Sequence, residues 1–209
     1  MSKSAPAEKM TPLRRRMRYA ARKVLLAAGV VAAAAVLVLA DRAGLFGRSD
    51  FAKYEGRSAK VVKVVDGDTL DVDITDGGHR HTRIRLWGVD TPETVKPNTP
   101  PQHFGRQAGK FTAAAAMGKT VRLELDPRQT RDKYNRLLAY VHLPDGRMLN
   151  RTLIARGCGY ADPRFEHRYK DEFRLLQDQA RKAQAGLWKE VRAEQLPFYY
   201  IGRIKLPER

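Results

Sequence analysis

The chain of 209 residues contains a single cysteine, Cys158, so it cannot form an internal disulfide. A lone thiol in an apolar run is usually a small core residue, and it leaves the cellular compartment open. His79 and His81 lie two residues apart, but no cysteine or third histidine accompanies them at the spacing of zinc ligands. The acidic residues within 71–76 lack the spacing and the closing glutamate of an EF-hand loop. The sequence therefore predicts neither a zinc site nor an EF-hand.

Acidic residues are scarce: 23 Asp and Glu stand against 40 Lys and Arg, and the formal net charge is +17. Residues 1–23 hold eight Lys or Arg and one acid, which leaves +10 for the rest of the chain. A strongly basic surface attracts polyanions, chiefly nucleic acid or anionic lipid. Charge alone does not choose between these partners, and it also fits a soluble protein that is merely cationic.

Long apolar runs are also rare, and only one stands out, at 24–40. These 17 residues contain no charged or strongly polar side chain. A helix of this length spans roughly 25 Å, at the short end for a bilayer core. Basic residues precede the run, so the positive-inside rule predicts that 1–23 stay in the cytosol and the rest of the chain crosses the membrane.

The apolar run has two possible fates. It could remain as a signal anchor, or it could be a signal peptide cleaved after Val38-Leu39-Ala40. Its length favours the anchor. We therefore expect a membrane-anchored protein with its main domain outside the cytosol, periplasmic or extracellular, or a secreted one if the run is cleaved. Residues 41–58 are predicted to be a linker.

Short β-type runs begin after the predicted linker. Apolar alternation and turn signals predict strands over 60–65, 69–74, 81–89, 120–125 and 137–143. A helix is predicted over 105–117, and two more follow, one with Asn150 as N-cap that Gly157 ends, and one ending near Gly186. This pattern predicts an α+β fold, a small five-stranded barrel of the OB type with inserted and appended helices. The domain is expected to span 59–188, with an irregular tail over 189–209.

Two acidic clusters lie where predicted strands end. Asp66 and Asp68 stand between the first two strands, and Asp90 and Glu93 follow the third. Each cluster alone fits an ordinary turn or strand end. Together they supply carboxylates beyond what turns require, and several oxygen ligands of this kind suit a hard cation such as calcium.

Two arginines lie close to these clusters in the sequence pattern. Arg85 precedes Asp90 by five residues, and Arg136 lies at the entry to the fifth strand. Hydrolysis of a phosphodiester builds negative charge on phosphoryl oxygens, which guanidinium groups and a metal ion can stabilise. Basic residues are abundant, however, and most must be solvated, so either arginine alone is weak evidence.

Three segments carry a resemblance to a known family. They read VVDGDT at 64–69, RIRLWGVDTPET at 83–94 and DKYNRLLAY at 132–140. In this order they resemble the signature stretches of the staphylococcal nuclease (thermonuclease) family, and weaker similarity runs from about 59 to 188. The resemblance implies a calcium-dependent endonuclease that cleaves DNA and RNA and leaves 3′-phosphate ends.

The resemblance also implies a calcium site and a group that acts on water. Asp68 and Asp90 would ligate Ca²⁺ through their carboxylates, and Thr91 would do so through its backbone carbonyl. Glu93 would act on the attacking water, either as general base or by orienting it. Asp66 resembles a turn residue or a supporting residue more than a ligand.

Four further residues would contact the substrate. The resemblance implies that Arg85 and Arg136 bind the scissile phosphate and stabilise the transition state. Lys133 and Tyr134 would bind substrate through phosphate charge and aromatic stacking.

Two non-enzymatic hypotheses remain beside the nuclease. A barrel of this type could have lost its chemistry and bind nucleic acid on its basic surface. An envelope-anchored interaction protein would explain the charge and the apolar run, but it leaves the acidic clusters without a purpose. The full set of acidic and guanidinium groups favours the enzyme. No protein partner is implied.

Overall fold

The computed structural model describes residues 22–36, 50–94, 102–204 and 206. The chain divides into two compact units, Met1–Ser49 and Asp50–Arg209. In the first unit, residues 22–36 form a helix with exposed side chains. Within the described ranges, no helix combines the length and the apolar character needed to cross a membrane. The segment predicted over 24–40 is thus helical as far as it is described, and its role in a membrane stays a prediction.

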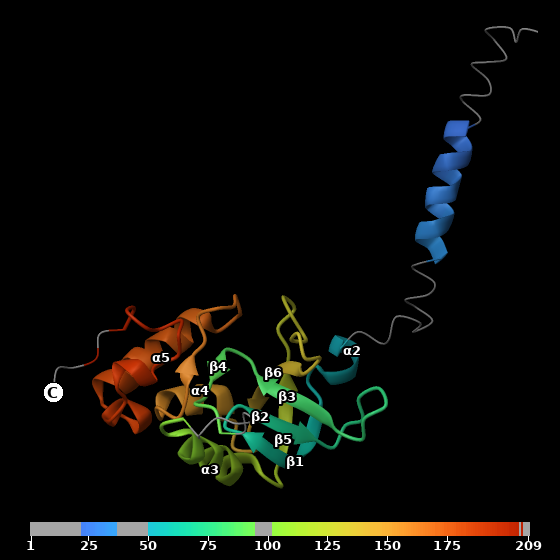
Figure 1. Cartoon of the computed structure of the whole chain (residues 1–209). Coiled ribbons are helices and arrows are strands. Elements are labelled where there is room, and N and C mark those ends of the chain that lie inside the picture. Colours follow the sequence, from blue (N-terminus) through green and yellow to red (C-terminus); the bar gives the residue numbers. More distant parts are fainter. Residues whose placement is uncertain (1–21, 37–49, 95–101, 205, 207–209) are drawn as a thin grey trace, which may run out of the picture. The chain divides into compact units, whose positions relative to one another are not determined.

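The second unit is built on a closed barrel of five strands (Figure 1), in the order β1-β2-β3-β6-β5. The strands are β1 (Ser58–Asp66), β2 (Thr69–Val72), β3 (Thr82–Leu86), β5 (Thr120–Glu124) and β6 (Leu137–His142). Neighbouring strands are antiparallel except β3 and β6, which run parallel and close the barrel. This arrangement confirms the predicted α+β fold with an OB-type barrel.

Helices cover the barrel outside its strands. The bounds are α2 (Asp50–Tyr54), α3 (Gly105–Ala116), α4 (Leu149–Ala155), α5 (Lys170–Lys182), η1 (Gly186–Lys189) and η2 (Ala193–Gln195). Helix α3 packs against β1, whereas α4 contacts β6 and α5. Figure 1 shows α4 and α5 together on one side of the barrel. Cys158 is buried in the main core and free, as predicted.

The third predicted strand, 81–89, is interrupted. Strand β3 ends at Leu86, and Trp87 and Gly88 form a turn before the two-residue strand β4 (Val89–Asp90). Gly88 has φ of 74°, a left-handed conformation that favours glycine. Strand β4 leaves the barrel and pairs with β7 (Tyr160–Ala161).

The predicted N-cap of α4 is wrong. Met148 precedes the first helical residue, and Asn150 lies inside the helix, fully buried. Its side-chain oxygen accepts from the Val141 amide at 2.9 Å, and its amide donates to the Trp87 carbonyl at 2.9 Å. Buried backbone groups require partners, so this side chain joins β6 to the turn after β3 instead of capping a helix.

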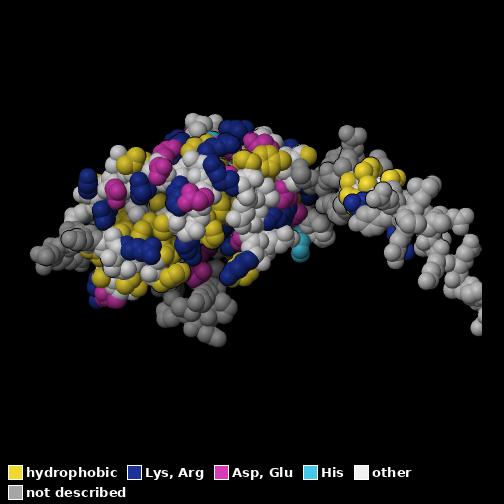
Figure 2. Space-filling view, turned by 90° about the horizontal axis from the view of Figure 1, so that it is seen from above, with side chains coloured by type: hydrophobic (Ala, Val, Ile, Leu, Met, Phe, Trp, Pro, Cys, Tyr) yellow, Lys and Arg dark blue, Asp and Glu magenta, His cyan; other side chains and the backbone are white. Residues whose placement is uncertain are grey.

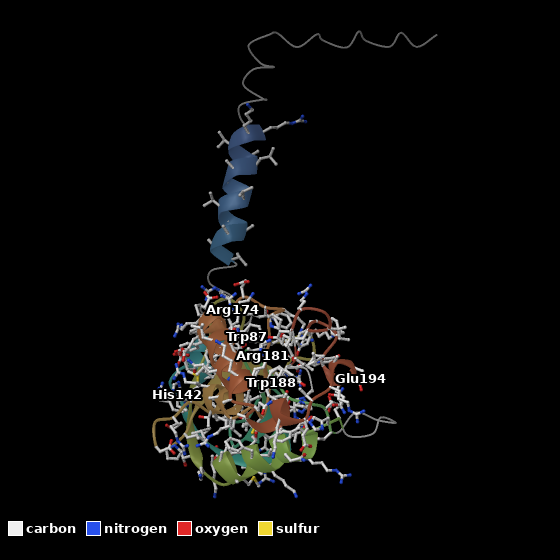
Figure 3. The ribbon with its side chains drawn as sticks, turned by 90° about the vertical axis from the view of Figure 1, so that its left-hand side faces the viewer. Trp87, His142, Arg174, Arg181, Trp188 and Glu194 are labelled. Carbon is white, nitrogen blue, oxygen red and sulfur yellow. The ribbon has the colours of Figure 1, made fainter. Side chains whose placement is uncertain are left out.

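The packed domain extends beyond both ends of the predicted range, 59–188. The predicted linker, 41–58, contributes α2, where Tyr54 is fully buried in the barrel core. Gly56 and Arg57 exchange backbone hydrogen bonds with Leu123 of β5. The described part of the predicted tail, 189–204, has little regular structure, but it forms part of a second buried cluster with Trp188 (Figure 3).

Candidate active site

A cavity of about 570 Å³ opens beside the barrel, and its lining gathers residues from widely separated parts of the chain. All the site residues predicted from the sequence line it: Asp68, Arg85, Asp90, Thr91, Glu93, Lys133, Tyr134 and Arg136. The structure therefore brings the two acidic clusters and both arginines into one cavity.

The turn after β3 places Arg85 next to Asp90. In a straight strand these residues would lie about 16 Å apart. The turn at Trp87 and Gly88 reverses the chain enough that Nη2 of Arg85 lies 2.7 Å from Oδ1 of Asp90. The guanidinium also donates to the carbonyl of Val89. A break in the strand, which the sequence pattern did not predict, thus creates the contact.

Asp68 lies in the turn between β1 and β2 and is almost fully buried. Its Oδ2 accepts from the Thr91 amide at 2.8 Å and from the Thr91 hydroxyl at 2.9 Å. Its Oδ1 accepts from the Thr69 hydroxyl at 2.9 Å. These donors fix the carboxylate and join the β1–β2 turn to the segment that follows β4.

Arg85 lies between Asp68, which is buried, and Asp90, which is half-buried. Its Nη1 is 3.1 Å from Oδ2 of Asp68, and its Nη2 contacts Asp90. Burial by itself lowers the pKa of Arg85, but Asp68 and Asp90 outweigh it and raise that pKa above its usual value. Burial raises the pKa of Asp90, the Arg85 charge opposes this, and Asp68 adds repulsion. The pair of carboxylates therefore favours positive charge between them.

Asp66 supports the segment that carries Glu93. Its Oδ1 accepts from the Thr94 hydroxyl at 2.7 Å and from the Gly67 amide at 2.8 Å. Burial raises the pKa of Asp66 to about 6; the Thr94 hydrogen bond opposes the shift, and the neighbouring Glu93 carboxylate adds to it. The Glu93 amide donates to Oε1 of Gln102 at 2.8 Å, which anchors the backbone of this glutamate.

The loop before β6 supplies the basic wall of the cavity. Nε of Arg136 donates to Oδ2 of Asp132 at 2.7 Å, and its Nη1 reaches the Thr69 hydroxyl at 3.4 Å. Tyr134 is 68% exposed, and the cationic groups of Lys133 and Arg136 lie 5.0 and 5.4 Å from its ring centroid. Since the Thr69 hydroxyl also donates to Asp68, it links Arg136 to Asp68.

Sequence reasoning missed two residues, Arg164 and Tyr199, that contact Asp90. Oδ2 of Asp90 accepts from the hydroxyl of Tyr199 and lies 3.3 Å from Nη2 of Arg164. Arg164 is itself held by Asp162 through two side-chain hydrogen bonds of 2.8 and 2.6 Å. Arg164 and Tyr199 lie 74 and 109 residues from Asp90 in the chain, so no local pattern could have indicated them.

The donor set fits a hard cation. In the part of the chain that the structure describes, no three His, Cys, Asp or Glu side chains are grouped as metal ligands. The candidate donors are instead two carboxylates, Asp68 and Asp90, and the carbonyl of Thr91, all of them oxygens. Calcium accepts such a set when waters complete its coordination, whereas zinc prefers nitrogen and sulfur.

Comparison with known proteins identifies the family. The family model described as "Staphylococcal nuclease homologue" matches residues 83–190. The thermonuclease of Staphylococcus hyicus is 38% identical over 164 residues, covering 76% of this chain and 94% of that protein. The thermonuclease of Staphylococcus intermedius is 45% identical over 137 residues, covering 64% and 77%. Endonuclease YncB of Bacillus subtilis (strain 168) is 37% identical over 128 residues, covering 60% and 59%.

The match extends beyond single motifs. The family model covers more than half of the chain, and the first of these relatives is matched over nearly its whole length. The fold and the cavity agree with the resemblance seen in the three sequence segments. This chain belongs to the staphylococcal nuclease family.

Proposed function

We propose that this chain is a calcium-dependent endonuclease that hydrolyses phosphodiester bonds of DNA and RNA and leaves 3′-phosphate ends. Its family and its relatives, named thermonucleases and an endonuclease, place it among the nucleases, which are hydrolases. One observation carries the finer proposal: Arg85 lies between Asp68 and Asp90 in the same cavity that Glu93 and Arg136 line.

Asp68, Asp90 and the Thr91 carbonyl would hold Ca²⁺ in this cavity. When bound, the cation would supply Lewis acidity and offset the charge of the phosphoryl oxygens. Arg85 contributes a guanidinium beside these ligands, already oriented by both carboxylates. The orientation exists before substrate binds, so little reorganisation is needed as negative charge develops.

Glu93 and Arg136 would act on the two sides of the reacting phosphate. The Glu93 carboxylate accepts a proton from the attacking water or orients that water, and its backbone is anchored by Gln102. Arg136, oriented by Asp132, offers guanidinium donors to a non-bridging phosphate oxygen. Lys133 and Tyr134 would contact the neighbouring nucleotide by charge and by base stacking.

The alternative is a barrel that binds nucleic acid without cleaving it. Figure 2 shows Lys and Arg side chains scattered over the face that it displays, and such a surface fits either function. Asp68 and Asp90 distinguish the two hypotheses. Carboxylates beside a phosphate site repel a polyanion and so weaken simple binding, but they are useful when they hold a cation.

The test of the function is cleavage by the full-length chain of closed circular DNA and of RNA, with added Ca²⁺ or with EGTA. We expect cleavage of both that requires Ca²⁺. The products should accept a 5′-phosphate label but should be extended by a polymerase only after a phosphatase removes the 3′-phosphate. A folded chain that binds both polymers and cleaves neither would instead support the binding module.

We further propose that the apolar run over 24–40 carries the nuclease domain across a membrane. The charge asymmetry around the run supports this, with eight Lys or Arg and one acid in residues 1–23. In bacterial cells making the full chain, we expect protease added outside the cytoplasmic membrane to digest the domain. Recovery in the membrane fraction with an intact N-terminus would indicate an anchor. A soluble product beginning after Ala40 would indicate cleavage, and protection from protease would contradict export.

A further inference from the structure

The C-terminal segment, 191–204, packs against the part of the fold that carries Asp90. Val191, Leu196, Tyr199 and Tyr200 are buried in a cluster with Trp188. The segment has little regular secondary structure, so its position depends on these side chains and on a few hydrogen bonds.

Two consecutive tyrosines of this segment contact the ribbon formed by β4 and β7. The Tyr200 hydroxyl donates to the carbonyl of Ala161 in β7 and accepts from Nε2 of Gln177 at 3.0 Å. The Tyr199 hydroxyl donates to Oδ2 of Asp90 in β4. Neighbouring hydroxyl groups thus have different partners, one a backbone carbonyl and the other a carboxylate of the candidate metal site.

The two oxygens of Asp90 face different neighbours. Oδ1 lies 2.7 Å from Nη2 of Arg85, whose Nη1 contacts Asp68. Oδ2 is held by Tyr199 and approached by Arg164 at 3.3 Å. The Arg164 guanidinium lies 4.4 Å from the Tyr199 ring centroid, so a cation–π contact also joins these two neighbours of Asp90.

We propose that Tyr199 is a positioning residue for calcium. Its buried hydroxyl holds Oδ2 of Asp90 and so fixes the carboxylate in the orientation in which Oδ1 lies beside Arg85. A cation bound by Asp68 and Asp90 in this cavity would depend on that orientation. Ligating carboxylates commonly depend on such hydrogen bonds for their orientation. The C-terminal segment then contributes Tyr199 to the active site. This inference rests on the calcium site proposed above.

The test compares Tyr199→Phe with Tyr200→Phe in the full-length chain without nucleic acid. Each substitution removes one buried hydroxyl and keeps the ring, so the loss of packing is matched. Calcium affinity is measured by calorimetric titration and by the rise of Tm with added Ca²⁺. We expect Tyr199→Phe to weaken calcium binding about tenfold or more, the magnitude typical for residues that orient metal ligands. Tyr200→Phe should bind calcium as the wild type does.

Cleavage provides a second readout. With Tyr199→Phe, the calcium concentration for half-maximal cleavage should rise, whereas the rate at saturating calcium should stay close to wild type. Equal calcium affinities in the two variants would overturn the inference, whether both are unchanged or both are reduced by general loosening. If the wild-type chain itself binds no calcium, the calcium proposal fails as well, which distinguishes the two failures.

Discussion

Replacing Arg136 by Ala or Glu93 by Gln is expected to lower kcat/KM for DNA cleavage several hundred-fold. Loss of one group that stabilises developing charge costs about 3–4 kcal/mol when that group is preorganised. Arg136 meets this condition because Asp132 and the Thr69 hydroxyl orient its guanidinium at the cavity. Glu93→Gln keeps the size of the side chain and removes its ability to accept a proton.

The chain offers a matched control for Arg136. Arg147 pairs with Asp145 through the same backbone and Nε contacts that Arg136 makes with Asp132, but it is exposed and outside the cavity lining. Arg147→Ala removes the same charge from the basic surface, so it should leave cleavage near wild type. If it lowers cleavage as much as Arg136→Ala does, the general charge of the surface would explain the loss, and the assigned role of Arg136 would be wrong.

The second large effect concerns Arg85 and stability. Arg85→Met should lower the free energy of unfolding by about 3–5 kcal/mol in calcium-free buffer, because it leaves the buried Asp68 and the half-buried Asp90 without their counter-charge. Both Asp68 and Asp90 lose an ion pair at once. Denaturation by urea, followed by tryptophan fluorescence, measures the change. Added calcium should recover part of the loss, since the cation supplies positive charge between the same carboxylates.

Two further variants make this result interpretable. Arg83 lies on the same strand and pairs with Asp71 at 2.8 Å, but its side chain is 50% exposed. Arg83→Met should therefore cost less than Arg85→Met, because its guanidinium is half exposed and only one carboxylate, Asp71, loses its partner. Arg85→Lys keeps the positive charge but loses the planar guanidinium that contacts both carboxylates, so its stability should lie between those of wild type and Arg85→Met. If Arg83→Met and Arg85→Met lower the free energy of unfolding equally, the ion pairs of Arg85 with Asp68 and Asp90 would have no special weight, which would contradict this prediction.

Much of the fold could be predicted because the relevant signals are local. Alternation along 120–125 and 137–143 corresponds to β5 and β6, and the Ala-rich stretch before Gly118 corresponds to α3. The prediction was wrong for Asn150, whose local pattern is that of a cap. Its actual partners are backbone groups of β6 and of the turn after β3, and these are brought near only by folding.

The candidate site shows the same division. Asp68, Arg85 and Asp90 could be selected from the sequence because they lie in short recognisable segments. The break after β3 could not, although it is what brings Arg85 to Asp90. The contact of Tyr199 with Asp90 was missed as well, since the tail in which it lies has no regular pattern.

The sequence by itself determined the basic charge, the run of strands and helices, and the acidic and guanidinium groups from which the site is made. Each of these depends on residue types and on spacing over a few positions. Only the tertiary structure decided the closure of the barrel by parallel β3 and β6, the position of Arg85 between two carboxylates, and the contact of Tyr199 in the C-terminal segment with Asp90. These features join residues that are distant in the chain, and their energies depend on burial, which exists only once the whole domain has packed.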